Sequence, residues 1–249
     1  MRSERALLPL RIAALAVALA GPAASDDDVQ ALRIGWSAPG ADGLPVGWRP
    51  LTFRNIPRHT QYALVRDGDQ WVVRAESKGS ASGLIYPCGA DARVTPILRW
   101  RWKVENLLAK SDVTRKEGDD YPARIYVAFA YDPKRAGFAQ RIEYEAARLL
   151  YGEYPPHAGL NYIWESKAPV GTVVPNPFTD RVRMFVVDGG AARLGQWVEH
   201  ERNIYEDYKT AFGEEPPMIA GIAVMTDTDQ TGESAVAYYG EIVLAPPQR

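Results

Sequence analysis

The stretch that decides the fold is AGIAVMTDTDQTGESAVAYYGEIVL, which spans residues 220–244. Two runs rich in β-branched, aromatic and small apolar residues flank a polar loop at 227–233. This pattern predicts a β-hairpin with strands over 220–226 and 234–244. The loop concentrates carboxylates and hydroxyls, so it is a candidate cation site, a candidate polar-ligand site, or a solvated turn.

Strict alternation of apolar and polar residues extends this β pattern along the chain. Residues 98–104 read LRWRWKV, which puts the apolar side chains on one face and Arg99, Arg101 and Lys103 on the other. Residues 124–131 alternate in the same way. Asp67-Gly68 predicts a tight hairpin turn between strands at 62–65 and 71–76. Further strand candidates are 32–36, 48–53, 83–86, 160–164, 182–187 and 196–201.

Two segments have helical spacing instead. Residues 136–150 place Phe138 and Ile142 one turn apart, and residues 203–212 start at a capping Asn203 and end before Gly213. About ten strands and two short helices predict a mostly β protein, a two-sheet antiparallel β-sandwich of the jelly-roll type.

The N-terminal residues have the composition of a secretory signal peptide. Arg2 and Arg5 precede a short apolar run at 7–20, and Ala18-Leu19-Ala20 is a small-residue cleavage pattern with further options up to Ser25. We expect a signal peptide over 1–24 and a single β-sandwich domain over 25–249, periplasmic or secreted. No later segment approaches the roughly 20 apolar residues that span a bilayer, so we expect no membrane span in the mature protein.

Charge and cysteine content narrow the function classes. The formal net charge is −2, which argues against nucleic acid as a partner. The single cysteine, Cys88, excludes an internal disulfide, and we interpret it as a small buried apolar group.

Arginines on strand faces form the first candidate site. Arg99 and Arg101 share one face of a predicted strand, and Arg124 lies on the polar face of another. If these faces meet, they form a cationic patch suited to an anionic small molecule or an acidic glycan, because a guanidinium pairs with carboxylate or phosphate through two hydrogen bonds. The alternative is an ordinary polar outer face, paired with local Glu and Asp.

Aromatic residues form the second candidate site. The chain has seven Trp and thirteen Tyr, and aromatic faces pack against the C–H faces of sugars. Most belong in the core or in cross-strand pairs. In LNYIWE, residues 160–165, either Asn161 and Glu165 or Tyr162 and Trp164 face solvent, and the second arrangement makes a binding strand.

Catalytic and metal motifs are weak. There is no HExxH, CxxC, GxSxG or P-loop pattern. Asp120 and Glu241 are the weak candidates for acid/base residues. Asp227 and Asp229 resemble the start of a calcium loop, but the twelfth position is Tyr238, which excludes an EF-hand. We expect no cofactor, with a calcium site at Asp227 and Asp229 as the alternative.

Several short motifs together resemble a known family. In chain order they are LRWRW (98–102), GDDYPARIYV (118–127), NYIW (161–164), Asp207-Tyr208, MTDTD (225–229) and AYYGEI (237–242). The set resembles a family of secreted bacterial proteins known only as a domain of unknown function, over residues 48–244. That family is similar to jelly-roll, galactose-binding-like carbohydrate-binding modules. The resemblance emphasises Asp119, Asp120, Arg124, Asn161, Trp164, Asp227, Asp229, Tyr239 and Glu241.

The sequence thus predicts a periplasmic or secreted β-sandwich that binds a carbohydrate or another polar, including anionic, ligand. The expected partner is a polar small molecule or a glycan. The predicted ligand-binding residues are Arg99, Arg101, Arg124, Asn161, Trp164, Asp227, Asp229 and Tyr239. Two alternatives remain open: a polysaccharide hydrolase or lyase on the same fold, and a non-catalytic structural or assembly protein of the cell envelope.

Overall fold

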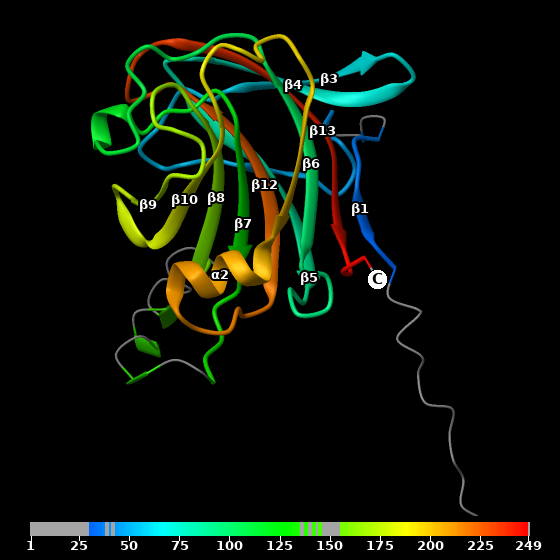
Figure 1. Cartoon of the computed structure of the whole chain (residues 1–249), viewed down its shortest axis with the longest axis vertical. Coiled ribbons are helices and arrows are strands. Elements are labelled where there is room, and N and C mark those ends of the chain that lie inside the picture. Colours follow the sequence, from blue (N-terminus) through cyan, green and yellow to red (C-terminus); the bar gives the residue numbers. More distant parts are fainter. Residues whose placement is uncertain are drawn as a thin grey trace, which may run out of the picture.

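Two β-sheets pack face to face in the protein, as the computed structural model shows (Figure 1). The structure describes residues 30–37, 40, 43–134, 137–138, 141–142, 144–145 and 155–248. One sheet has the strand order β11-β6-β13-β4-β3, with β1 paired to β13; the other has the order β2-β5-β12-β7-β8-β10-β9. We call them the six-stranded and the seven-stranded sheet.

The strands fall where alternation predicts them, with longer bounds in most cases. They are β1 Leu32–Ile34, β2 Arg49–Leu51, β3 Gln61–Asp67, β4 Gln70–Lys78, β5 Ala81–Ala90, β6 Ile97–Val104, β7 Arg124–Phe129, β8 Ala158–Glu165, β9 Val173–Asn176, β10 Thr179–Gly189, β11 Val198–Asn203, β12 Ile219–Asp227 and β13 Ser234–Ala245. The mostly β, two-sheet prediction is confirmed. The hairpin at Asp67-Gly68 is also confirmed, because Asp67 pairs with Gln70 across Gly68, whose φ is 59°.

The sheets are not wholly antiparallel, which corrects the prediction. Strands β8 and β10 run parallel, from Val182 opposite Gly159 to Gly189 opposite Glu165. The chain passes from β8 to the sheet edge, forms β9 there, and returns as β10 between the two. Strand β9 was not predicted, because Pro175 interrupts it; proline is tolerated there because β9 is an edge strand.

The closing strand pair is not a hairpin. Strand β12 belongs to the seven-stranded sheet and β13 to the six-stranded sheet, so the polar loop at 228–233 carries the chain from one layer to the other. Strand β12 is almost entirely buried and β13 buries most of its residues, and a sandwich achieves this by placing one strand in each sheet. The loop therefore lies at one end of the sandwich.

The helix prediction is half confirmed. Helix α2, Ile204–Phe212, begins at Asn203, whose side chain accepts a hydrogen bond from the Glu206 N–H, and ends at Gly213 with φ 71°. A 3-10 turn, η2, spans Lys116–Gly118. In the predicted helix at 136–150, the described residues from Phe138 to Glu145 are helical, and the rest lies outside the described residues.

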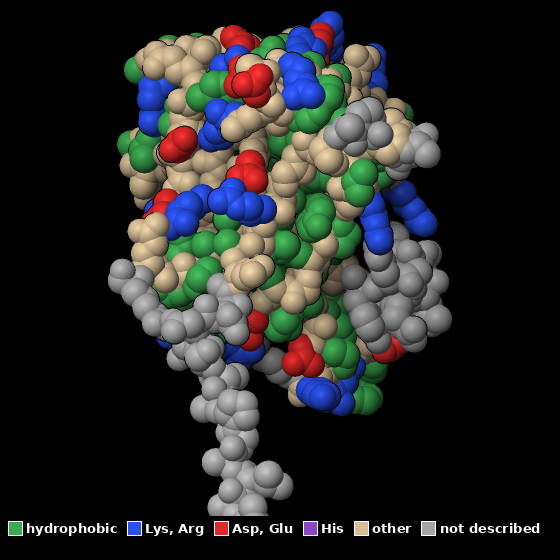
Figure 2. All heavy atoms as spheres, turned by 90° about the vertical axis from the view of Figure 1, so that its right-hand side faces the viewer, with side chains coloured by type: hydrophobic (Ala, Val, Ile, Leu, Met, Phe, Trp, Pro, Cys, Tyr) green, Lys and Arg blue, Asp and Glu red, His purple; other side chains and the backbone are tan. Residues whose placement is uncertain are grey.

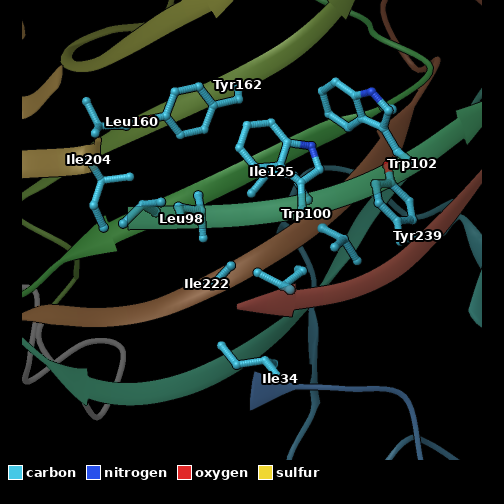
Figure 3. Packing of buried hydrophobic residues seen from close by; sticks show 14 of the residues in the cluster. Ile34, Leu98, Trp100, Trp102, Ile125, Leu160, Tyr162, Ile204, Ile222 and Tyr239 are labelled. Atoms are coloured by element: carbon cyan, nitrogen blue, oxygen red, sulfur yellow. The ribbon is translucent and has the colours of Figure 1, made fainter. Parts of the chain in front are cut away.

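The core fills the space between the two sheets. Figure 3 shows Trp100 of β6 between Tyr162 of β8 and Trp102, with Ile125 beside Trp100 and Ile222 below. Trp100 and Trp102 meet edge to face, with ring centroids 5.6 Å apart. These residues are the apolar members of the alternating strands, so their polar neighbours point to the outer faces of the sheets.

Among the described residues, no helix combines the length and apolar character that crossing a membrane requires. The expected signal peptide lies outside the described residues.

Candidate functional site

The outer face of the seven-stranded sheet carries the candidate site. Ile125 of β7 and Val224 of β12 pack into the core, so Arg124, Tyr126 and Asp227 point the other way. They lie on adjacent strands, since β7 pairs with β12. Sequence alternation predicted this side for Arg124, and the structure places it at the centre of a polar cluster.

Arg124 and Asp227 form a buried ion pair. The Arg124 side chain is 2% exposed; its Nε donates to Asp227 Oδ1 at 2.7 Å and its Nη2 donates to Asp227 Oδ2. The guanidinium also donates to the Asp119 backbone carbonyl and, at 3.2 Å, to the Tyr126 hydroxyl. It lies over the Tyr121 ring, 4.4 Å from the centroid. This side chain is therefore fixed in place by four neighbours.

The pKa of Asp227 is raised to about 8 because burial disfavours the charged carboxylate. Arg124 opposes this shift, while Asp120 and Asp119 add to it. Burial also raises the pKa of Asp120, although the Thr231 backbone N–H opposes that change. Burial therefore favours the neutral form of both carboxyls, while Arg124 favours the ionised form of Asp227.

The Asp120 side chain holds the backbone of the neighbouring loop in place. It is fully buried, and its two oxygens accept the backbone N–H groups of Gln230 at 3.3 Å and Thr231 at 2.6 Å. It therefore fixes the loop at 228–233 against the segment that precedes β7.

A pocket of about 640 Å³ opens over this cluster. It crosses β5, β12 and β7, and two segments form its sides: the loop at 52–56 between β2 and β3, and the turn between β9 and β10. Its polar lining includes Asp119, Arg124, Tyr126, Asn176, Asp227, Asp229 and Gln230. We call this space the outer-face pocket.

Two exposed aromatic rings flank the outer-face pocket. Phe53, on the loop at 52–56, is 38% exposed, and Phe178, in the β9–β10 turn, is 55% exposed. The strand order puts them on opposite sides of the polar floor. Exposed Phe rings beside a polar floor suit a ligand that has both apolar C–H faces and polar groups.

Asn161 lies next to this floor on β8. It pairs with Tyr126 of β7 and with Met184 of β10, and it is fully buried. Neither polar atom of its side-chain amide has a hydrogen-bond partner among the described residues. Buried amide groups are normally hydrogen-bonded, so the Asn161 side chain is expected to bind a water molecule or a polar group of a ligand.

Three carboxylates meet at one end of the outer-face pocket. Ligand atoms of Asp120, Asp227 and Asp229 lie within 4.8 Å of one another. Asp120 and Asp227 already accept hydrogen bonds from backbone and guanidinium N–H groups, whereas calcium takes six to eight oxygen ligands. The calcium alternative stays a prediction.

The predicted arginine patch does not assemble. Arg99 and Arg101 lie on β6 in the six-stranded sheet, whereas Arg124 lies on the seven-stranded sheet. Arg99 pairs with Glu201 at 2.5 Å, and Arg101 donates to Gln70 at 2.6 Å and stacks on Trp197, 4.3 Å from the ring centroid. Figure 2 shows Lys and Arg side chains beside Asp and Glu side chains on the side where β1 and β13 lie.

Two predicted contact residues face the core. Trp164 is fully buried and its ring lies 6.3 Å from that of Trp102. The Tyr239 hydroxyl bonds the Thr226 hydroxyl at 2.8 Å and donates to the Met225 carbonyl at 2.5 Å inside the sandwich. Of the alternatives at 160–165, Asn161 and Glu165 are thus on the outer side, but both are buried.

The two weak acid/base candidates do not lie together. Asp120 precedes β7 of the seven-stranded sheet, and Glu241 lies on β13 of the six-stranded sheet, paired with Arg33 at 2.6 Å. The structure therefore does not bring them to one scissile bond.

Sequence reasoning missed Phe53, Phe178 and Asn176. Asn176 donates to Asp119 Oδ2 at 3.2 Å and so ties the β9–β10 turn to the pocket floor. The signal for Phe178 was an aromatic residue within the turn Asn176-Pro177-Phe178, where no core position is expected.

Comparison with known proteins gives a family match. The model of a family described as "Protein of unknown function (DUF3047)" matches residues 46–243. The family resemblance predicted from the sequence is confirmed. No curated protein matches the chain.

The solved structures that match the chain share little sequence with it. A family 11 carbohydrate-binding module of a Clostridium thermocellum cellulosomal cellulase is 8% identical, with 82% of this chain and 90% of that chain covered and a TM-score of 0.39. The xyloglucanase domain of a Sinorhizobium fredii type three effector, in complex with cellobiose, is 7% identical, with 80% and 98% covered and a TM-score of 0.39.

Proposed function

The chain belongs to the DUF3047 family, and we propose that it binds a carbohydrate in the outer-face pocket. The observation that carries this proposal is a polar floor between two exposed Phe rings. A sugar presents apolar C–H faces and hydroxyl groups on one molecule, so it can use both features at once.

The floor supplies hydrogen-bonding groups of both kinds. The carboxylates of Asp119 and Asp229 accept hydrogen bonds, the Tyr126 hydroxyl accepts or donates, and the amides of Asn176 and Gln230 do both. Sugar hydroxyls are themselves donors and acceptors, and a mixed floor of this kind matches them.

Hydrogen bonds among its own residues also fix the floor of the pocket in the absence of a ligand. Arg124 is bound to Asp227, Asp119 and Tyr126, and Asn176 is bound to Asp119. A preorganised floor loses little side-chain entropy on binding. The exposed rings of Phe53 and Phe178 add apolar contact area for the ligand at the two sides of the pocket.

We further propose that the protein works in the periplasm or outside the cell, where polysaccharides are accessible. This rests on the signal-peptide composition of residues 1–24. Mass spectrometry of the N-terminus of the protein from periplasm and culture medium tests it. A full-length chain found in the cytoplasm would contradict it.

A glycan array, followed by calorimetry with the saccharides that bind, tests carbohydrate binding. The single variants Phe53→Ala and Phe178→Ala should each weaken binding by about five- to thirtyfold, in the range of aromatic contacts at interfaces. Both rings are exposed, so the melting temperature should not change. The matched control is Val173→Ala, an exposed apolar residue on β9 that does not line the pocket.

The outcomes separate clearly. Loss of affinity in both Phe variants, with an unchanged control, supports the proposal. If no saccharide on the array binds, or if both Phe variants bind as tightly as the wild type, carbohydrate binding in the outer-face pocket is wrong.

A further inference from the structure

The charge of the outer-face pocket narrows the class of sugar. Asp119, Asp227 and Asp229 line it, and Asp120 lies directly behind them. Against these four carboxyl groups stand the guanidiniums of Arg124 and Arg54 in the lining and the ammonium of Lys116 beside Phe178. Because burial raises the pKa of Asp227 to about 8, the charges in and around the pocket nearly balance below that pH, and the class of ligand depends on which charged groups are free to bind it.

The positive charge of Arg124 is not free to bind a ligand. It is 2% exposed, and its N–H groups are directed to Asp227, Asp119 and Tyr126. An anionic sugar would have to compete with Asp227 for it, at the cost of leaving a buried carboxylate without its partner. This geometry disfavours uronic acids and sulfated sugars.

Asp229 offers the free carboxylate oxygen. The side chain is partly exposed, and Oδ2 accepts a hydrogen bond from Gln230 Nε2 at 2.8 Å. Oδ1 accepts no hydrogen bond from the residues that the structure describes. Asp229 lines the same pocket as Phe53, Phe178 and Tyr126.

An ammonium group fits this arrangement better than a metal ion. An ammonium needs up to three acceptors and keeps its affinity for aromatic faces, whereas calcium needs six or more oxygens. Lys116 already places its ammonium nitrogen 5.5 Å from the Phe178 ring centroid, so a cation at this rim is compatible with the structure.

We propose that the outer-face pocket prefers a saccharide with a free amine, whose ammonium binds Asp229 while the sugar rings contact Phe53 and Phe178. This inference rests on the proposed carbohydrate binding and specifies its ligand class. The ligand would be an amino sugar or a de-N-acetylated glycan.

Matched saccharide sets test the preference. Each set has one chain length and linkage, and its members carry a hydroxyl, a free amine, an N-acetyl group or a carboxylate at the same carbon. Calorimetry is carried out on the full protein at about pH 6, where such amines are protonated. We expect the amine to bind about tenfold tighter than the hydroxyl compound, as for a hydrogen bond to a charged group, and the carboxylate to bind weakest.

Two variants connect the preference to Asp229. Asp229→Asn keeps the size of the side chain and should reduce the ratio of amine to hydroxyl affinity from about tenfold to below about threefold. Glu199→Gln is the matched control, because Glu199 is an exposed carboxylate on the six-stranded sheet. It should leave the ratio unchanged.

The results distinguish this inference from the proposal beneath it. If hydroxyl saccharides bind and the amine binds no tighter, or the carboxylate binds tightest, the amine preference is wrong while carbohydrate binding stands. If Asp229→Asn leaves the ratio intact, the assignment to Asp229 is wrong. If no member of any set binds, carbohydrate binding itself is refuted.

Discussion

Replacing Arg124 by Met should destabilise the protein far more than the same change at a surface arginine. Met keeps the apolar stem but removes every hydrogen bond that the guanidinium makes to Asp227, Asp119 and Tyr126. Asp227 would then be buried at 2% exposure without its counter-charge. At about pH 8 and above, where the Asp227 carboxyl ionises in the folded protein, breaking one side of this buried ion pair costs about 3–5 kcal/mol in the free energy of unfolding.

The matched control is Arg99→Met. Arg99 also lies on the polar face of a strand, and its pair with Glu201 is 2.5 Å long, but the two side chains are 33% and 57% exposed. Such exposed pairs contribute about 0–1 kcal/mol. Urea unfolding followed by tryptophan fluorescence measures both variants. An Arg124→Met penalty below about 1 kcal/mol, or equal to that of Arg99→Met, would refute the buried ion pair as an anchor of the site.

The loss of unfolding free energy caused by Arg124→Met should increase as the pH rises. The folded-state pKa of Asp227 is raised to about 8, above its unfolded value of about 4. Its contribution to stability is therefore fully present below about pH 4 and is lost as the pH rises through about 8. Without Arg124, which lowers this pKa, protonation neutralises the stranded carboxyl even more readily. The Arg124→Met penalty should be larger at about pH 8 than at about pH 5, and the opposite order would contradict this assignment.

Three further outcomes are expected. Trp164→Ala should lower the free energy of unfolding by about 3–5 kcal/mol, because it leaves a cavity among core aromatics; a loss below about 1 kcal/mol in urea unfolding would place Trp164 outside the core. Tyr239→Phe should cost about 1–3 kcal/mol by the same assay, because its hydroxyl bonds Thr226 and the Met225 carbonyl; an unchanged midpoint would argue against these bonds. Millimolar calcium, or EDTA, should move the melting temperature by less than about 1 °C, and a calcium-dependent rise of several degrees would instead establish a metal site beside Asp227.

Alternation predicted the strands because each sheet buries one face against the other. Alternation does not predict which residues of the polar face are buried. Arg99 and Arg124 follow the same pattern in sequence, yet Arg99 is a partly exposed surface residue and Arg124 is buried. The difference comes from Asp119 and Asp227, which reach Arg124 from other parts of the chain, and no local pattern reports such contacts.

Strand β8 shows a second limit. All eight of its residues are buried, because the core covers one face and the segment before β7 packs on the other through Val113 and Tyr121. With both faces covered, period-two alternation cannot tell which face binds a ligand. Trp164 was therefore predicted at the ligand when it lies in the core, and Phe178, in a turn, was missed.

The most direct test of the account is hydrogen–deuterium exchange with and without the tightest-binding saccharide from the array. Binding in the outer-face pocket predicts slower amide exchange in residues 52–56, 176–182 and 229–230, with no change in β6 and β11. Slower exchange confined to β6 and β11, around Arg99 and Arg101, would place the ligand on the six-stranded sheet and contradict the account.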